Sequence, residues 1–64
     1  MKNYYNVSFK YSETVYCANI AHAESEDAVE NYYSEYEWIH ISKSSPSDVE
    51  LAKRKGMPII EIDS

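Results

Sequence analysis

The sequence of 64 residues is poor in the residue types that cross-link small proteins or build tight loops. Its single cysteine excludes an internal disulfide, so the fold must be held by packing, and a reducing compartment is expected. One glycine and two prolines exclude a low-complexity or disordered composition. The lone glycine also leaves no glycine-rich loop for binding phosphate.

Long apolar runs and positive charge are scarce as well. The first residues lack the apolar run of a signal peptide, and no stretch reaches transmembrane length, so we expect a cytoplasmic protein without a membrane partner. Six basic residues face eleven acidic ones, for a net charge of −5. This charge disfavours non-specific binding to nucleic acid or to anionic membranes.

The first third of the chain has the pattern of a β-hairpin. Residues 5–11 alternate between an apolar and a polar face, which is typical of a half-buried strand. Residues 14–21 are rich in β-formers and semi-apolar on both faces, which favours a central strand. Ser12-Glu13 between them is a weak turn signal, without the glycine or asparagine that tight hairpins favour.

A stretch from Ser25 to Ile41 organises the rest of the chain. Ser25 is a plausible N-cap, and Glu26 and Asp27 place negative charge where a helix dipole favours it. One apolar stripe follows at helical spacing: Val29, Tyr32, Tyr33 and Tyr36. Residues 37–43 then predict a third strand, with the side chains at 38 and 40 on one face and those at 39 and 41 on the other.

The last third predicts a capped helix and a closing strand. Ser45 as N-cap, Pro46 in the first turn and Asp48 three residues after the cap form a variant of the capping box. Gly56 and Pro58 end this helix, and residues 59–62 form the fourth strand. A short apolar face is expected from three residues of the helix: Val49, Leu51 and Ala52.

These elements predict one α+β domain over residues 1–64, with the order ββαβαβ. The simplest architecture for so short a chain is a four-stranded mixed sheet with both helices packed on one face. Strand–helix–strand connections imply parallel strands and a right-handed crossover, but the strand order stays open.

Three stretches resemble a group of short uncharacterised proteins carried on integrative and conjugative elements of Gram-positive gut bacteria. They are residues 11–21 (YSETVYCANIA), 36–38 (YEW) and 54–62 (RKGMPIIEI). The resemblance implies a bacterial, mobile-element context and no established activity.

The candidate interaction surface consists of acidic and aromatic residues. Residues 24–37 hold six of the eleven acids and no base. Such a surface can bind a basic protein or imitate a phosphate backbone, although a solvated helix face is the simpler interpretation. Exposed aromatics would favour a protein interface, whereas tyrosines at these spacings more often pack in a core. The candidate residues are Glu26, Asp27, Glu30, Glu37, Tyr16 and Trp38.

The remaining polar residues indicate little chemistry. The basic cluster 53–55 could contact phosphate, but cations also complement a helix C-terminus. Cys17, His22 and His40 match no metal-ligand spacing and no catalytic pattern. We therefore expect no cofactor and a small acidic, non-enzymatic binding protein, with an unknown protein partner or a second copy of itself. The alternative is a nucleic-acid-directed role, through DNA mimicry by the acidic helix or weak direct contact by basic residues.

Overall fold

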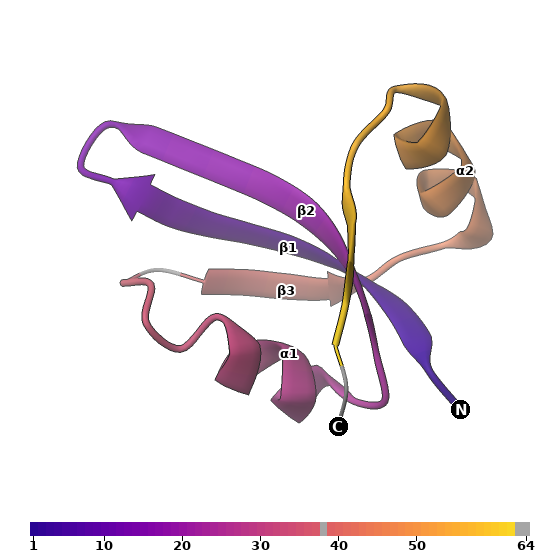
Figure 1. The fold of residues 1–64 in the computed structure, drawn as a ribbon, viewed down its shortest axis with the longest axis horizontal. Helices are drawn as coiled ribbons and strands as arrows, with labels where there is room; N and C mark the ends of the chain where they lie inside the picture. Colours follow the sequence, from indigo (N-terminus) through magenta and orange to yellow (C-terminus); the bar gives the residue numbers. More distant parts are fainter. Residues whose placement is uncertain (38, 63–64) are drawn as a thin grey trace.

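The computed structural model describes residues 1–37 and 39–62, which form a four-stranded mixed sheet and two helices (Figure 1). The predicted order ββαβαβ is confirmed. The elements are β1 (Asn3–Ser12), β2 (Val15–Ala23), α1 (Glu26–Tyr32), β3 (Ile39–Lys43), α2 (Pro46–Arg54) and β4 (Ile59–Glu61).

The strand order is β3-β1-β2-β4, so β1 and β2 are the central strands and β3 and β4 the edges. Strand β1 pairs antiparallel with both neighbours, with Val7 opposite Asn19 of β2 and Ile41 of β3. Strand β4 pairs in parallel with β2, from Ile20–Ile59 to His22–Glu61. The central position of the second strand, predicted from its two apolar faces, is confirmed.

The β1–β2 hairpin turns at Glu13 and Thr14 without a residue in the left-handed region. Within the described residues, Gly56 alone has a positive φ, of 73°, so the hairpin does not use a type I′ or II′ turn. The strand register shifts between Lys10 and Ser12, which leaves Tyr11 outside the regular ladder and exposed. A bulge of this kind increases the local twist, and Figure 1 shows the hairpin bending away from β3.

The main core lies on one face of the sheet, beneath α1. Alternate residues of β1 fill it, because successive side chains of a strand point to opposite faces. The buried members of this core are Tyr5, Val7, Phe9, Ala21, Ala23, Val29, Tyr33 and Ile62. Ile39 and Ile41 pack against it from β3, which confirms that these two side chains share a face.

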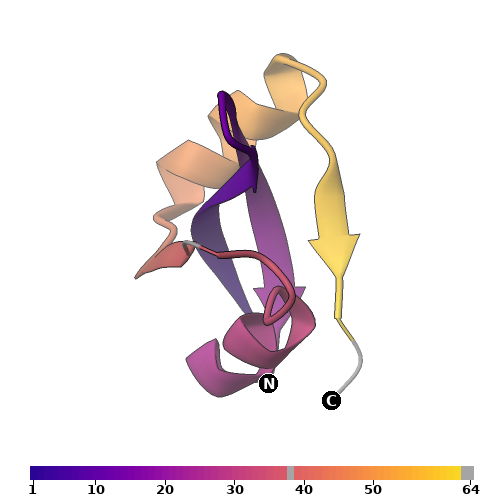
Figure 2. The same ribbon diagram turned by 90° about the vertical axis from the view of Figure 1, so that its left-hand side faces the viewer.

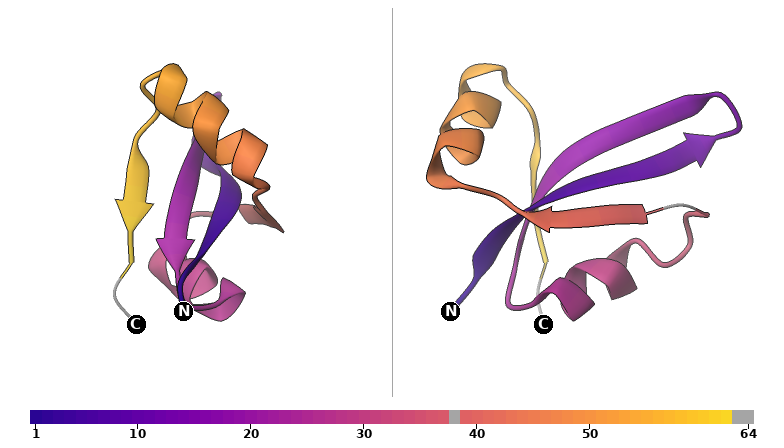
Figure 3. Two further views of the ribbon diagram at one scale, coloured as in Figure 1. Left: turned by 90° about the vertical axis from the view of Figure 1, so that its right-hand side faces the viewer. Right: turned by 180° about the vertical axis from the view of Figure 1, so that it is seen from behind.

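The two helices lie on opposite faces of the sheet, which corrects the prediction that both pack on one face. Figure 2 shows α1 in front of the strands, and the opposite view in Figure 3 (left) shows α2 in front. Contacts agree with this placement: Val29 of α1 joins the core beneath Phe9, whereas Asp48 of α2 bonds to Asn6, which points to the other face.

The strand order explains this placement. Strands β2 and β3 run in the same direction, and α1 connects them across β1 towards one edge. Helix α2 then connects β3 to β4, which lies at the opposite edge and runs parallel to both. Because the two crossovers travel in opposite lateral directions, they can have the same hand only if their helices cover opposite faces.

Helix α1 is shorter than the tyrosine stripe predicts. Ser25 caps it as expected, with its hydroxyl accepting a bond from the Ala28 amide, but the helix ends at Tyr32. Tyr33, the C-cap, still donates its amide to the Val29 carbonyl, and Tyr36 follows after a turn. Both rings pack on Phe9, at centroid distances of 5.0 and 4.5 Å. Tyr32, the last residue of the helix, lies at the margin of this face and is 52% exposed.

Helix α2 follows its sequence signals closely. The Ser45 hydroxyl accepts a bond from the Asp48 amide, and the Asp48 carboxylate accepts one from the Ser45 amide, so the capping box is confirmed. Gly56 adopts the left-handed conformation after the helix. Leu51 does not join the apolar face as predicted, since it is 51% exposed while Val49 and Ala52 are buried.

Burial of Val29 is expected to hold α1 on the sheet. Val29→Ala should lower the free energy of unfolding by about 2 kcal/mol, because two buried methyl groups are replaced by a cavity. The matched control is Val15→Ala, the same change at a half-exposed strand position, which should cost less than about 0.5 kcal/mol. Urea denaturation measures both, and equal losses would contradict the packing of α1 described above.

The buried hydroxyl of Tyr33 should not stabilise the fold. The ring is 2% exposed, and the hydroxyl has no hydrogen-bond partner among the described residues. Burial raises the pKa of Tyr33 above its usual value, and the nearby Asn19 side chain counteracts only part of this effect. Tyr33→Phe should therefore leave the free energy of unfolding unchanged or raise it by up to about 1 kcal/mol. A loss of about 1 kcal/mol would instead mean that the hydroxyl bonds to Asn19 in solution.

Candidate protein-binding surface

Three of the candidate carboxylates lie together on α1. Glu26, Asp27 and Glu30 are all exposed, and no basic residue follows in the last turn of this helix. The first two complement the positive end of the helix dipole, which is their structural role. Glu30, one turn after Glu26, has no such role and extends the negative charge along the side of the helix.

These carboxylates border a depression between α1 and β3. One part, of about 210 Å³, is lined by Glu26, Glu30, Ile39 and Ile41. A second part, of about 410 Å³, shares Glu30 and Ile39 and adds Asp27, Asn31 and Ser34. We call these two adjoining parts the acidic groove. Its lining combines the apolar side chains of Ile39 and Ile41 with three carboxylates, and includes no basic residue of the described chain.

The acidic groove runs along an open edge of the sheet. Strand β3 pairs with β1 on one side, and no strand of the described chain pairs with its other side. The Ser44 amide donates a hydrogen bond to the Tyr4 carbonyl, with nitrogen and oxygen 2.9 Å apart. Tyr4 and Ser44 are therefore a hydrogen-bonded pair, and every second pair along the β1–β3 ladder is hydrogen-bonded in the same way. By this alternation, His40 and Ser42 bond to β1, and the amides and carbonyls of Ile39, Ile41 and Lys43 point outward.

The other candidate residues do not belong to this groove. Glu37 lies beyond the end of α1, with a carboxylate oxygen 3.9 Å from the Lys10 ammonium. Tyr16 is 66% exposed but lies on β2 opposite Lys10, on the face of the sheet away from α1. Trp38 lies outside the described residues. The predicted surface therefore divides, and only its α1 part forms a groove.

Sequence reasoning missed a basic groove on the α2 side. It has a volume of about 430 Å³, and three of the six basic residues line it: Lys2, Lys43 and Lys53. Tyr4, Val49 and Glu50 also line it. The lysines come from the chain before β1, the end of β3 and α2, so only the strand order could have brought them together. Arg54 and Lys55, predicted to act with Lys53, are not among its lining residues.

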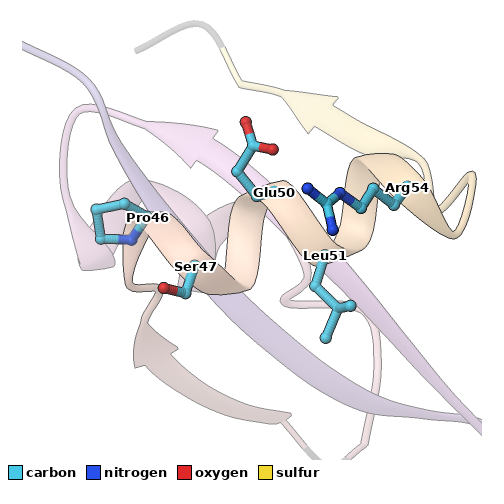
Figure 4. Close-up of a pocket in the computed structure, with 5 residues that line it drawn as sticks. All are labelled: Pro46, Ser47, Glu50, Leu51 and Arg54. Carbon is cyan, nitrogen blue, oxygen red and sulfur yellow. The ribbon is translucent and has the colours of Figure 1, made fainter.

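The outer surface of α2 carries a second, shallower depression. Figure 4 shows its lining residues along the helix, with Leu51 pointing away from Glu50 and Arg54. Among the described residues, Leu51 is the one large apolar side chain that lines it, beside Pro46 and Ser47. An isolated exposed leucine is normal on a small domain, so this surface supports no site.

The residues considered for chemistry have structural contacts instead. The His22 ring stacks on Tyr4 with centroids 4.3 Å apart, and its Nδ1 lies 2.6 Å from the Glu61 carboxylate, which ties β1, β2 and β4 together. Cys17 is half-buried against the core, and His40 is exposed. No group of three potential metal ligands was found within residues 1–37 and 39–62.

Comparisons with known proteins add no relative. Scans against protein-family models, curated proteins and solved structures each returned no match. Among the helices of the described residues, none is long and apolar enough to cross a membrane. Function must therefore be argued from the surface of this chain.

The Asp48 carboxylate should make stability depend on pH at low pH. Bonds from the Ser45 amide, the Asn6 side chain and the Ser45 hydroxyl hold the pKa of Asp48 below its usual value of 3.8. A depressed pKa means that this carboxylate stabilises the fold above pH 3.8, and that the effect is lost as the pH falls through the lower, folded-state value. Asp48→Asn should lower Tm at neutral pH, and the difference from wild type should shrink below about pH 3.8.

Thermal unfolding by circular dichroism between pH 2 and 7 measures this difference. Glu13→Gln, in the hairpin turn, is the control and should show no comparable difference from wild type. A Tm difference for Asp48→Asn that stays constant over the whole range would show that the carboxylate charge does not carry the effect.

Proposed function

We propose that this protein binds another protein through the acidic groove. The observation that carries the proposal is the combination of three carboxylates, two half-buried isoleucines and an open strand edge in one place. Carboxylates alone would be explained as a solvated helix face. An apolar floor beneath them and unpaired backbone groups beside them are what a binding surface needs in addition.

The partner should present a basic surface. The chain carries a net charge of −5, and the groove has no basic residue in its lining to offset its three carboxylates. Opposite charges steer the encounter and select the partner, while burial of Ile39 and Ile41 would supply the non-electrostatic part of the affinity. Binding should therefore weaken with salt without disappearing abruptly.

The proposal includes a non-enzymatic, cytoplasmic role in a bacterial mobile-element context. A chain of 64 residues has little material with which to enclose a substrate cleft. The lone cysteine supports a reducing compartment. The mobile-element context rests on the sequence resemblance alone.

Neutralising the acidic groove should weaken partner capture. Glu26→Gln with Glu30→Gln is expected to lower affinity about tenfold or more, because both carboxylates line the groove. The matched control is Glu13→Gln with Glu50→Gln, which removes the same charge from the hairpin turn and from α2. Wild type and both variants, immobilised, are exposed to a bacterial lysate and eluted in salt steps. A partner that both variants retain equally would contradict the proposal.

A nucleic-acid-directed role is the alternative, and the grouping of Lys2, Lys43 and Lys53 favours it. Direct binding would appear as a gel shift of a single-stranded oligonucleotide that is lost when these lysines are changed to glutamine. DNA mimicry would appear as capture of a DNA-binding protein that DNA displaces from wild type. A homodimer would appear as an increase in molecular mass with protein concentration.

A further inference from the structure

We propose that the acidic groove holds its partner as an added β-strand, antiparallel to β3, formed by an extended basic segment. This inference rests on the proposed function and specifies its binding mode and the chemistry of the partner. It is drawn from the geometry of the sheet edge next to α1.

The two edges of the sheet differ in their capacity to accept a strand. Strand β4 has three residues and begins directly after Pro58, which lacks an amide proton. Strand β3 has five residues, contains no proline, and pairs with β1 in regular register throughout. Natural edges are usually blunted by proline, bulges, short length or charged side chains. Strand β3 has none of the first three, and its one charged residue, Lys43, stands at its end.

The outward backbone groups of β3 lie beside the acidic groove. The ladder alternation places the free amides and carbonyls on Ile39, Ile41 and Lys43. The side chains of Ile39 and Ile41 point to the α1 face, where they form the floor between Glu26 and Glu30. A chain that bonds to these backbone groups would therefore project alternate side chains directly into the groove.

Those alternate side chains should be lysine or arginine. In an antiparallel pair, residues directly opposite each other share a face, so they would lie against Ile39 and Ile41. A long basic side chain can pack its methylene groups on these isoleucines while its charged end reaches Glu26 or Glu30. Lys43 ends β3 and lines the basic groove instead, so the basic positions should oppose residues 39 and 41.

A second copy of this chain is a poor occupant of the same edge. Two β3 strands paired with each other would bring two acidic grooves together, each with Glu26, Asp27 and Glu30. Both chains also carry a net charge of −5. Like charges facing each other across a strand pair destabilise it, so the groove selects a basic segment over self-association.

The probe is a six-residue peptide of alternating lysine and threonine, acetylated and amidated at its ends. Two N-methylated forms carry methyl groups either on all lysine amides or on all threonine amides. Antiparallel addition with lysine facing α1 directs the lysine amides to β3 and the threonine amides to solvent. Methylated lysine amides should therefore weaken binding about tenfold or more, and methylated threonine amides should leave it nearly unchanged.

Binding is measured by fluorescence anisotropy at low salt, together with hydrogen exchange of the protein amides by NMR. The unmodified peptide should slow exchange at Ile39 and Ile41 and leave His40 and Ser42, already bonded to β1, unaffected. A glutamate–threonine peptide controls for charge, and Glu26→Gln with Glu30→Gln controls for the groove.

Each outcome has a distinct meaning. If the two methylated peptides bind equally well, strand addition is wrong, but the proposed function is not contradicted. Loss only on threonine methylation would overturn the antiparallel arrangement with lysine facing α1. If the unmodified peptide does not bind, or binds the Glu26→Gln, Glu30→Gln variant equally well, both the strand addition and the proposed function fail.

Discussion

Pairing of β1 on both of its edges is the interaction on which the rest of the fold depends. Its backbone bonds β2 on one side and β3 on the other, and its alternate side chains Tyr5, Val7 and Phe9 fill the core beneath α1. A one-residue slip in register would turn these three side chains to the other face. The hairpin, the core and the position of β3 are therefore fixed together.

The position of β1 also decides where the charges lie. Because β1 separates β2 from β3, the connection through α1 crosses β1 to reach the edge strand β3. The connection through α2 then crosses the whole sheet in the opposite direction to reach the other edge strand, β4. Crossovers of one hand then place α1 and α2 on opposite faces. The carboxylates of α1 gather on one face with β3, while Lys53 of α2 lines a separate groove together with Lys2 and with Lys43 at the end of β3. The two grooves of opposite charge are a consequence of strand order.

Local signals in the sequence were sufficient to predict the helices and strands but not how they are arranged in space. The caps at Ser25 and Ser45, and the alternation along β1, depend on neighbouring residues and could be predicted. The faces of the helices depend on strand order, which hydrophobic periodicity does not encode. Tyr32 and Leu51 were predicted on the buried faces of their helices, but each short helix buries only a narrow stripe, at Val29 in α1 and at Val49 and Ala52 in α2.

The candidate site, too, could be predicted only where it depends on neighbouring residues. The acids of α1 were visible as a run without bases, and Glu26, Asp27 and Glu30 do lie together. Their neighbours Ile39 and Ile41 were predicted to share one face of a strand, but nothing local indicates that this strand is an edge beside the acids. Tyr16 was grouped with the acids as a candidate interface aromatic, but the pleat of β2 places it on the other face. The basic groove has no local signal at all.

The acidic groove also suggests how an open strand edge is tolerated in so small a domain. An unprotected edge invites pairing with identical chains, and β3 lacks the proline, bulge or short length that usually prevents this. Carboxylates beside the edge repel other copies of the chain, which carry the same charge at the same place. The same carboxylates do not repel a basic segment. The carboxylates beside β3 thus disfavour self-association and leave the strand edge accessible to a partner of opposite charge. The same residues protect the edge from other copies of the chain and select the partner.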